Sequence, residues 1–187
     1  MTIAETYAPS KSGFRTRAAY NVALVGVGSA FIALTAQISF TLPFSPVPVT
    51  GQTFGVLLLA ALLGRVRGTL AVATYLAEGL CGLPVFAGGM GSAVVFLGPT
   101  GGYLLGFLPA AFVVGALAER GWDKRAITSG LAMVLGAAAI FAVGLSWLKI
   151  YVGVENTLTM GLYPFLAGEA VKIAAAMVTL PALRRFV

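Results

Sequence analysis

Apolar residues fill most of the chain in long runs that polar and charged positions interrupt only briefly. An α-helix needs about 20 apolar residues to cross roughly 30 Å of hydrocarbon. The second and third runs are shorter, so we expect flanking residues to extend them or a protein-lined cavity to enclose their ends. The pattern predicts six transmembrane helices, over residues 18–40, 51–64, 68–83, 101–118, 127–148 and 163–183.

The composition supports a membrane protein. Of the 187 residues, 59% are hydrophobic and only 10% are charged, whereas soluble domains carry about 25% charged residues. We expect an all-α integral membrane protein with a cytoplasmic N-terminal segment at 1–17 and a single six-helix membrane domain at 18–187. The N-terminal segment leads into the first apolar run without a convincing cleavage site, which favours a retained helix over a signal peptide.

The basic residues predict the orientation of these helices. With the N-terminus inside, only Lys149 and Lys172 fall on the outer side. This bias follows the positive-inside rule and predicts that both termini lie in the cytoplasm. We expect a multi-pass protein of the inner (cytoplasmic) membrane. The other basic residues fall on the cytoplasmic side and are Lys11, Arg15, Arg17, Arg65, Arg67, Arg120, Lys124, Arg125, Arg184 and Arg185.

Several functional classes are excluded by charge distribution and by missing residue types. The net charge of +6 does not indicate a nucleic-acid partner, because the basic residues stand in short clusters between apolar runs. The chain has no His and one cysteine, Cys81, which excludes an internal disulfide, zinc-protease motifs and His-based nucleophile pairs. A P-loop motif is also missing, so the chain cannot cradle ATP in that way. We expect no catalytic residue, cofactor or metal.

Two outer connections are long, uncharged and rich in Pro and Gly. They read TLPFSPVPVTGQ at 41–52 and GLPVFAGGMGSAVVFLGPTGG at 82–102. Their prolines disfavour helix and favour extended or turn backbone. Long loops in compact domains tend to be functional, so we favour a lid that folds over a ligand pocket. The alternative is a pair of ordinary compact connectors.

The last apolar run contains a pair of opposite charges. Glu169 and Lys172 are spaced i, i+3 and therefore share one face of a helix. Charges at membrane depth are costly and usually face a cavity or a partner. Lys172 would attract an anionic group of a small ligand, and Glu169 would accept hydrogen bonds from N–H donors. The alternative is a structural ion pair near the interface, with Lys172 snorkelling outward.

Other candidate residues give weaker signals. Gln52 follows three prolines and could point its amide into the same cavity, whereas Glu78 could lie in the cavity or at the interface. Ala19 and Ala23 form a small-xxx-small pair that is consistent with close helix packing. Most aromatic residues at the outer ends are expected in the core or the aromatic belt, and they are Phe44, Phe54, Phe86, Phe96, Tyr103 and Phe107.

Four segments together resemble a known family. SPVPVTGQTFGVLLLAALLG, GLPVFAGG, GPTGGYLLGF and PFLAGEAVK stand in the order and spacing of BioY proteins, the biotin-binding S components of energy-coupling-factor (ECF) transporters. The resemblance covers nearly the whole chain. It implies six helices with both ends cytoplasmic, and an outer pocket for biotin that the two uncharged connections close. Biotin is then the transported substrate, captured from outside.

The resemblance also implies roles for particular residues. Glu169 and Lys172 correspond to an acidic residue and a lysine that contact the ligand, although the family usually has Asp where this chain has Glu169. Ala19 and Ala23 match a small-residue motif that packs against the transmembrane coupling subunit. Uptake is expected to need that subunit and ABC-type ATPases, or else self-association of the chain. Residues within the family motifs that we expect at the pocket are Gln52, Phe86, Gly89 and Tyr103.

Three other functions compete with this interpretation. The first is an S component or small transporter for a different vitamin or small organic anion. The second is an ion-coupled secondary carrier that uses Glu78, Glu169 and Lys172 as relay groups. The third is an intramembrane enzyme, for which no paired-carboxylate or Ser/Lys site can be assembled from the sequence.

Overall fold

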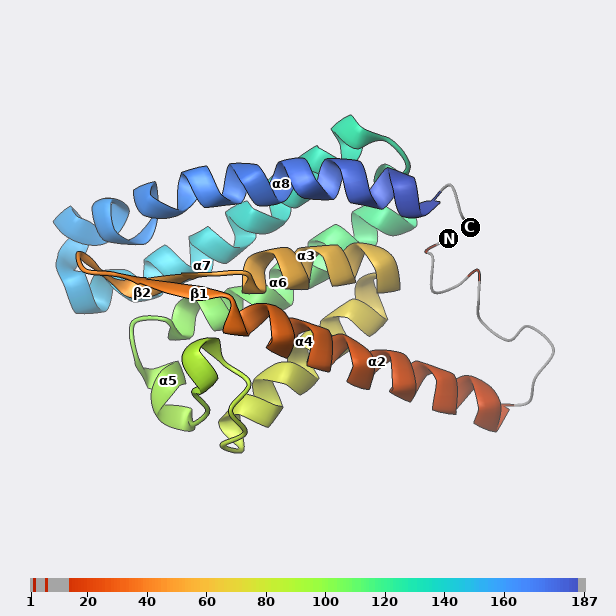
Figure 1. Ribbon diagram of the computed structural model, residues 1–187, viewed down its shortest axis with the longest axis horizontal. Helices are drawn as coiled ribbons and strands as arrows, with labels where there is room; N and C mark the ends of the chain where they lie inside the picture. Colours follow the sequence, from red (N-terminus) through yellow and green to blue (C-terminus); the bar gives the residue numbers. More distant parts are fainter. Residues whose placement is uncertain (1, 3–5, 7–13, 185–187) are drawn as a thin grey trace.

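The computed structural model describes residues 2, 6 and 14–184, and this part of the chain is mostly helical (Figure 1). Lys11, Arg185 and most of the expected N-terminal segment 1–17 lie outside the described residues. Short elements are the 3-10 helices η1 (Ala87–Gly89) and η2 (Trp122–Lys124) and the helix α5 (Ala93–Leu97). The longer helices are α2 (Phe14–Gln37), α3 (Gln52–Leu63), α4 (Arg65–Leu80), α6 (Gly101–Glu119), α7 (Ala126–Gly161) and α8 (Tyr163–Arg184).

Within the described residues, four helices are long and apolar enough to cross a membrane: α2, α6, α7 and α8. The helices α3 and α4 are shorter, with 12 and 16 residues, at the two places where the apolar runs are short. The protein is therefore a multi-pass membrane protein with a mostly helical fold. Figure 1 shows the start of α2 and the end of α8 at the same end of the molecule.

A β-hairpin connects α2 to α3 at the opposite end of the molecule (Figure 1). Strands β1 (Ser39–Leu42) and β2 (Ser45–Thr50) pair antiparallel, with Ser39 opposite Thr50. Pro46 and Pro48 lack an N–H donor, which suits an edge strand. The extended backbone predicted for this connection is confirmed, and the fold is mostly helical rather than all-α. At the turn, the Ser45 hydroxyl donates a 2.7 Å hydrogen bond to the Met160 carbonyl of α7.

The helix α7 is longer than its apolar run predicts. The run ends at residue 148, but the helix continues to Gly161 with a break at Gly153, where φ is 77° and ψ is 161°. Glycine adopts this backbone conformation readily because it has no Cβ. Lys149 and Glu155 are exposed on this extension, so these polar residues end the apolar pattern without ending the helix.

The central helix of the bundle is α6, which packs against α3, α4 and α7. Its contact with α7 is close because Gly102 and Gly106 carry no side chain. A Cβ at Gly102 would lie 2.2 Å from the Cβ of Trp147, and a Cβ at Gly106 would lie 3.0 Å from the Ile140 backbone. This packing holds the aromatic residues at the start of α6 inside the bundle, directly below the hairpin.

Candidate functional site

Glu169 and Lys172 of α8 form a polar cluster with Thr53 of α3. The Lys172 Nζ lies 2.7 Å from Glu169 Oε1 and 2.7 Å from Thr53 Oγ1. The Thr53 hydroxyl in turn donates to Glu169 Oε1 at 2.7 Å. The side chains are 6% exposed for Glu169 and 18% exposed for Lys172. In the pair expected from its i, i+3 spacing, Glu169 is thus buried and Lys172 is partly buried, and a second helix shares the pair.

Burial of these charges restricts what the cluster can do. Removing an ion from water costs several kcal/mol, and the attraction within a pair offsets this only when further hydrogen bonds satisfy both groups. The contacts above use one Glu169 oxygen and two of the three Lys172 N–H donors. Among the described residues, Glu169 Oε2 and the third N–H therefore stay available for a polar ligand.

A cavity of about 40 Å³ lies against this cluster. The strand β2 of the hairpin forms one wall, and the other walls come from α3, α6, α7 and α8. Aromatic and aliphatic side chains face the charged pair, as in typical small-molecule sites. The lining residues are Val47, Pro48, Thr50, Gln52, Thr53, Tyr103, Phe107, Ile140, Phe141, Phe165, Glu169 and Lys172.

Gln52 lines the cavity, and both ends of its amide are already hydrogen-bonded. Its Nε2 donates to the Tyr75 hydroxyl of α4, and its Oε1 accepts from the Thr50 hydroxyl at 3.1 Å. The Tyr75 hydroxyl donates to the Val85 carbonyl at 3.2 Å. Gln52 therefore links the base of the hairpin to α4 and to the connection that follows α4.

Tyr103 also lines the cavity, at the first turn of α6. Its hydroxyl donates to the Gly161 carbonyl at the end of α7 at 2.8 Å. Its ring lies 6.2 Å from the Phe141 ring and 6.3 Å from the Phe165 ring. Such aromatic contacts stabilise a packed wall, and this wall joins α6, α7 and α8.

Phe86 and Gly89 do not line this cavity. Phe86 is buried against Tyr75 and Phe96, with ring separations of 5.5 and 5.7 Å. Gly89 has a positive φ of 71°, and its N–H donates to Gln37 Oε1 at 3.1 Å. These two residues hold the 82–102 connection against α2 and α4, on the far side of Tyr75.

The remaining sequence candidates lie elsewhere. The Ser29 hydroxyl of α2 donates to Glu78, and Glu78 does not line the cavity that Glu169 and Lys172 share. Ala19 and Ala23 are exposed on α2. Sequence reasoning missed Thr53, Tyr75 and Phe165. Thr53 carried a signal, since it is a polar residue directly after Gln52 at the start of an apolar run.

The architecture is that of an S component, a class of membrane-embedded binding subunit. The structure is similar to the crystal structure of the S-component for biotin from an ECF-type ABC transporter, with a TM-score of 0.83 and 28% sequence identity. The match covers 93% of this chain and 95% of that chain. The protein therefore has a transporter fold and is not an enzyme.

The chain belongs to the BioY family, whose sequence model matches residues 8–187. It is 44% identical over 153 residues to "Biotin transporter BioY" of Thermotoga maritima, covering 81% of this chain and 88% of that protein. It is 38% identical over 160 residues to "Probable biotin transporter BioY" of Pyrococcus horikoshii, covering 86% and 93%. The relative in Rhodobacter capsulatus, also "Biotin transporter BioY", is 40% identical over 171 residues, covering 82% and 87%.

Proposed function

We propose that this protein captures biotin from outside the cell and mediates its uptake as the substrate-binding subunit of a transporter. The observation that carries the proposal is the charged pair of the buried Glu169 and the partly buried Lys172, which lies inside the helix bundle next to a cavity under the hairpin. The names of the relatives and the S-component fold support biotin as the ligand. The resemblance seen in the sequence motifs points the same way.

The lining of the cavity matches the chemistry of biotin. The ureido ring of biotin offers two N–H donors and a carbonyl acceptor, its thiophane ring and chain are apolar, and its valerate end is a carboxylate. Glu169 accepts N–H donors, Lys172 donates to a carbonyl or a carboxylate, and Tyr103 belongs to the apolar wall. We place Gln52 behind this first layer, since its amide already bonds to Thr50 and Tyr75.

Biotin entry requires the hairpin to move. The cavity of about 40 Å³ is far smaller than the roughly 300–1,000 Å³ of typical ligand pockets. The hairpin is the thinnest wall, because two strands rather than a helix separate the cavity from the outer end of the molecule. We propose that it acts as the lid, while the 82–102 connection with Phe86 and Gly89 supports it from the side.

In the proposed topology, six transmembrane helices cross the inner membrane, and both termini lie on its cytoplasmic side. Residues 1–17 form a cytoplasmic segment, and residues 18–187 form one membrane domain. Two observations support this arrangement. The start of α2 and the end of α8 lie at the same end of the molecule (Figure 1), and these two helix ends carry Arg15, Arg17 and Arg184.

Partner subunits are proposed to drive transport. The chain has no P-loop motif of its own, so ATP hydrolysis would come from ABC-type ATPases through an ECF transmembrane coupling subunit. Ala19 and Ala23 are exposed on α2, and small residues allow another helix to approach closely. Self-association of the chain is the other arrangement that this surface could serve.

Titration calorimetry of the purified protein with biotin tests the proposed site. Lys172→Met and Glu169→Gln are each expected to weaken binding at least about tenfold, because each removes a hydrogen bond to a charged group. Lys149→Met is the matched control, since Lys149 is exposed on α7 and away from the cavity. Biotin amide, which lacks the carboxylate, tests which end of biotin contacts Lys172. If the Lys172 ammonium contacts the biotin carboxylate, the unaltered protein should bind the amide less tightly than biotin, and Lys172→Met should bind the two equally.

The outcomes separate the site from the ligand. Binding that survives both changes would show that the pair is structural and would move the site elsewhere. If the unaltered protein binds another vitamin or organic anion but not biotin, the cavity would remain the proposed binding site and biotin would be refuted as the substrate.

A further inference from the structure

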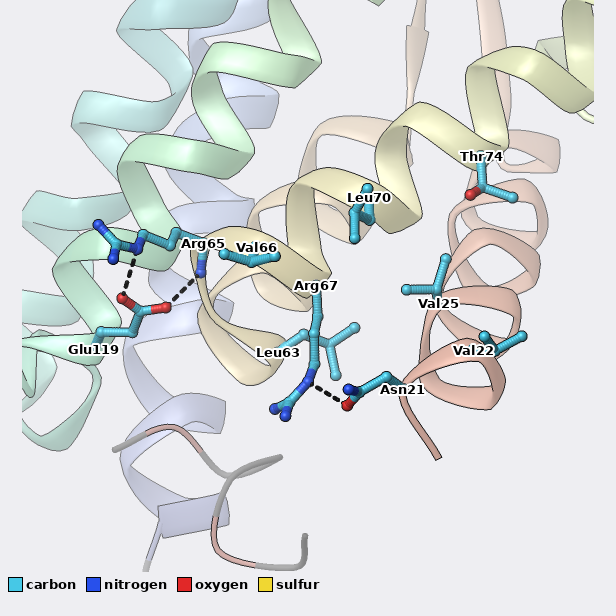
Figure 2. Close-up of a pocket in the computed structure, with 10 residues that line it drawn as sticks. All are labelled: Asn21, Val22, Val25, Leu63, Arg65, Val66, Arg67, Leu70, Thr74 and Glu119. Carbon is cyan, nitrogen blue, oxygen red and sulfur yellow. Dashed lines mark hydrogen bonds and ion pairs between the residues drawn. The ribbon is translucent and has the colours of Figure 1, made fainter. Parts of the chain in front are cut away.

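A second, larger hollow lies at the other end of the molecule. It is a groove of about 550 Å³ between the first half of α2 and the start of α4, at the end of the bundle away from the hairpin (Figure 2). Its apolar walls include Val22 and Val25 of α2 and Leu70 of α4. The groove shares no residue with the cavity at Glu169 and Lys172, so it has no place in the proposed capture of biotin.

The packing of α2 against α4 explains why the groove opens. The two helices meet at Gly28, where a Cβ would lie 3.0 Å from the Ala71 Cβ and 2.9 Å from Leu59 Cδ2. Nearer the start of each helix, contact is made instead by the long side chain of Arg67, whose Nε donates to Asn21 Oδ1 at 2.8 Å. The helices α2 and α4 are therefore close together at Gly28 and farther apart at Arg67, and the groove lies between them where they diverge.

The apolar walls of the groove are open to the surroundings. Val22, Val66 and Leu70 are 71%, 60% and 51% exposed. These residues lie on the outside of a membrane-embedded bundle, so hydrocarbon rather than water is their natural neighbour. An acyl chain laid along the groove would cover them.

The charges of the groove differ in how they are satisfied. Arg65 is paired with Glu119, with its Nε 3.3 Å from Oε2 and its backbone N–H 2.9 Å from Oε1. Arg67 contacts the neutral Asn21 and makes no ion pair within residues 14–184 (Figure 2). Its guanidinium has five N–H donors, and the contact with Asn21 orients this planar fork while using one of them. The planar fork of Arg matches the geometry of a phosphate.

We propose that this groove binds one anionic phospholipid, with its phosphate on Arg67 and an acyl chain along Val22, Val25 and Leu70. A cation that makes no ion pair within the described residues, beside an exposed apolar wall, is complementary to an amphiphile that carries a negative headgroup. An anionic lipid supplies a negatively charged partner for Arg67. A zwitterionic lipid, in contrast, brings its own cation into a site that already holds two arginines.

Titration of the detergent-purified full chain with short-chain lipids tests this proposal. The probes are dioctanoyl phosphatidylglycerol, dioctanoyl phosphatidylcholine and glycerol phosphate, the last of which carries the phosphate without the chains. We expect saturable binding of phosphatidylglycerol that Arg67→Gln weakens at least about fivefold, since one basic group near an anionic lipid contributes on this scale. Arg125→Gln is the matched control, because Arg125 is exposed and outside the groove, and it should change the affinity less than twofold.

Four results would overturn the proposal. Equal affinity for the two lipids would remove the role of charge, and an equal loss in Arg67→Gln and Arg125→Gln would show general surface attraction only. Glycerol phosphate binding as tightly as the lipid would make this a free-phosphate site. No saturable binding would leave the groove to a helix of another membrane protein. If Arg67→Gln does not fold, Arg67→Lys keeps the charge, loses the planar fork, and should still bind more weakly than the unaltered protein.

Discussion

Thr53 of α3 and Glu169 of α8, which stand 116 positions apart in the sequence, share a hydrogen bond of 2.7 Å. The same Thr53 oxygen accepts a hydrogen bond from Lys172, so the charged pair belongs to two helices and not to α8 alone. Because α3 begins directly after the hairpin, a ligand at the pair would contact a segment that is continuous with the proposed lid.

Replacing Thr53 with Val removes the shared hydroxyl and keeps the shape of the side chain. We expect biotin affinity to fall at least about tenfold, because a hydrogen bond to a charged group contributes roughly 1.5–3 kcal/mol and one factor of ten is about 1.4 kcal/mol. Titration calorimetry measures the change. Thr53→Ser restores the hydroxyl and should recover most of the affinity. Equal loss in both variants would contradict a role for the hydroxyl.

Replacing Tyr75 with Phe should lower stability more than it lowers affinity. The change leaves the Gln52 amide and the Val85 carbonyl without the partner that they share, and a buried polar group without a partner costs about 1–3 kcal/mol. Thermal unfolding in detergent measures this as a lower Tm. Tyr151→Phe is the control, since Tyr151 is exposed although its hydroxyl donates to the Leu97 carbonyl. A Tm change as large in the control would refute the assigned role of Tyr75.

Two glycines with equal space around them should respond in opposite ways to alanine. A Cβ at Gly153 or at Gly26 would meet nothing within 4 Å, but Gly153 has a φ of 77°. Gly153→Ala should destabilise the protein by about 1–3 kcal/mol through backbone strain. Gly26→Ala, within a regular helix, should be neutral or stabilising by up to about 1 kcal/mol. Unfolding midpoints of the two variants provide the comparison, and similar values would show that the backbone at position 153 accepts a Cβ without strain.

Bulky residues on the exposed face of α2 should impair assembly without impairing capture of biotin. Ala19→Leu and Ala23→Leu would block the close approach of another helix. We expect the doubly substituted protein to bind biotin normally and to co-purify with its coupling subunit in clearly reduced amounts. Ala174→Leu, an exposed position on α8, is the control for added bulk in the membrane. Undiminished co-purification of the double variant would rule out this surface as the contact.

The features that sequence reasoning predicted correctly depend on neighbouring residues. The apolar runs match the longer helices, the prolines of 41–52 match the hairpin, and Lys172 contacts Glu169 one helical turn away. The features that it missed depend on which helices are neighbours in space. Nothing local shows that Thr53 faces α8, or that Tyr75 separates Phe86 from the cavity. The length of α7 was also missed, because polar residues end an apolar pattern before they end a helix.

One hydrogen bond joins the hairpin turn to α7, from the Ser45 hydroxyl to the Met160 carbonyl. Opening of the hairpin and rearrangement of the helices are therefore expected on different time scales. One neutral hydrogen bond of roughly 0.5–1.5 kcal/mol is broken and re-formed in the nanoseconds to microseconds of loop motion, whereas rearrangement of packed helices takes microseconds to seconds. If the hairpin is the lid proposed above, the entrance would reach equilibrium before the bundle rearranges. For the lid proposed above, occupancy of the isolated subunit would follow the external biotin concentration, and the slow step of the proposed cycle would be the rearrangement of the packed helices.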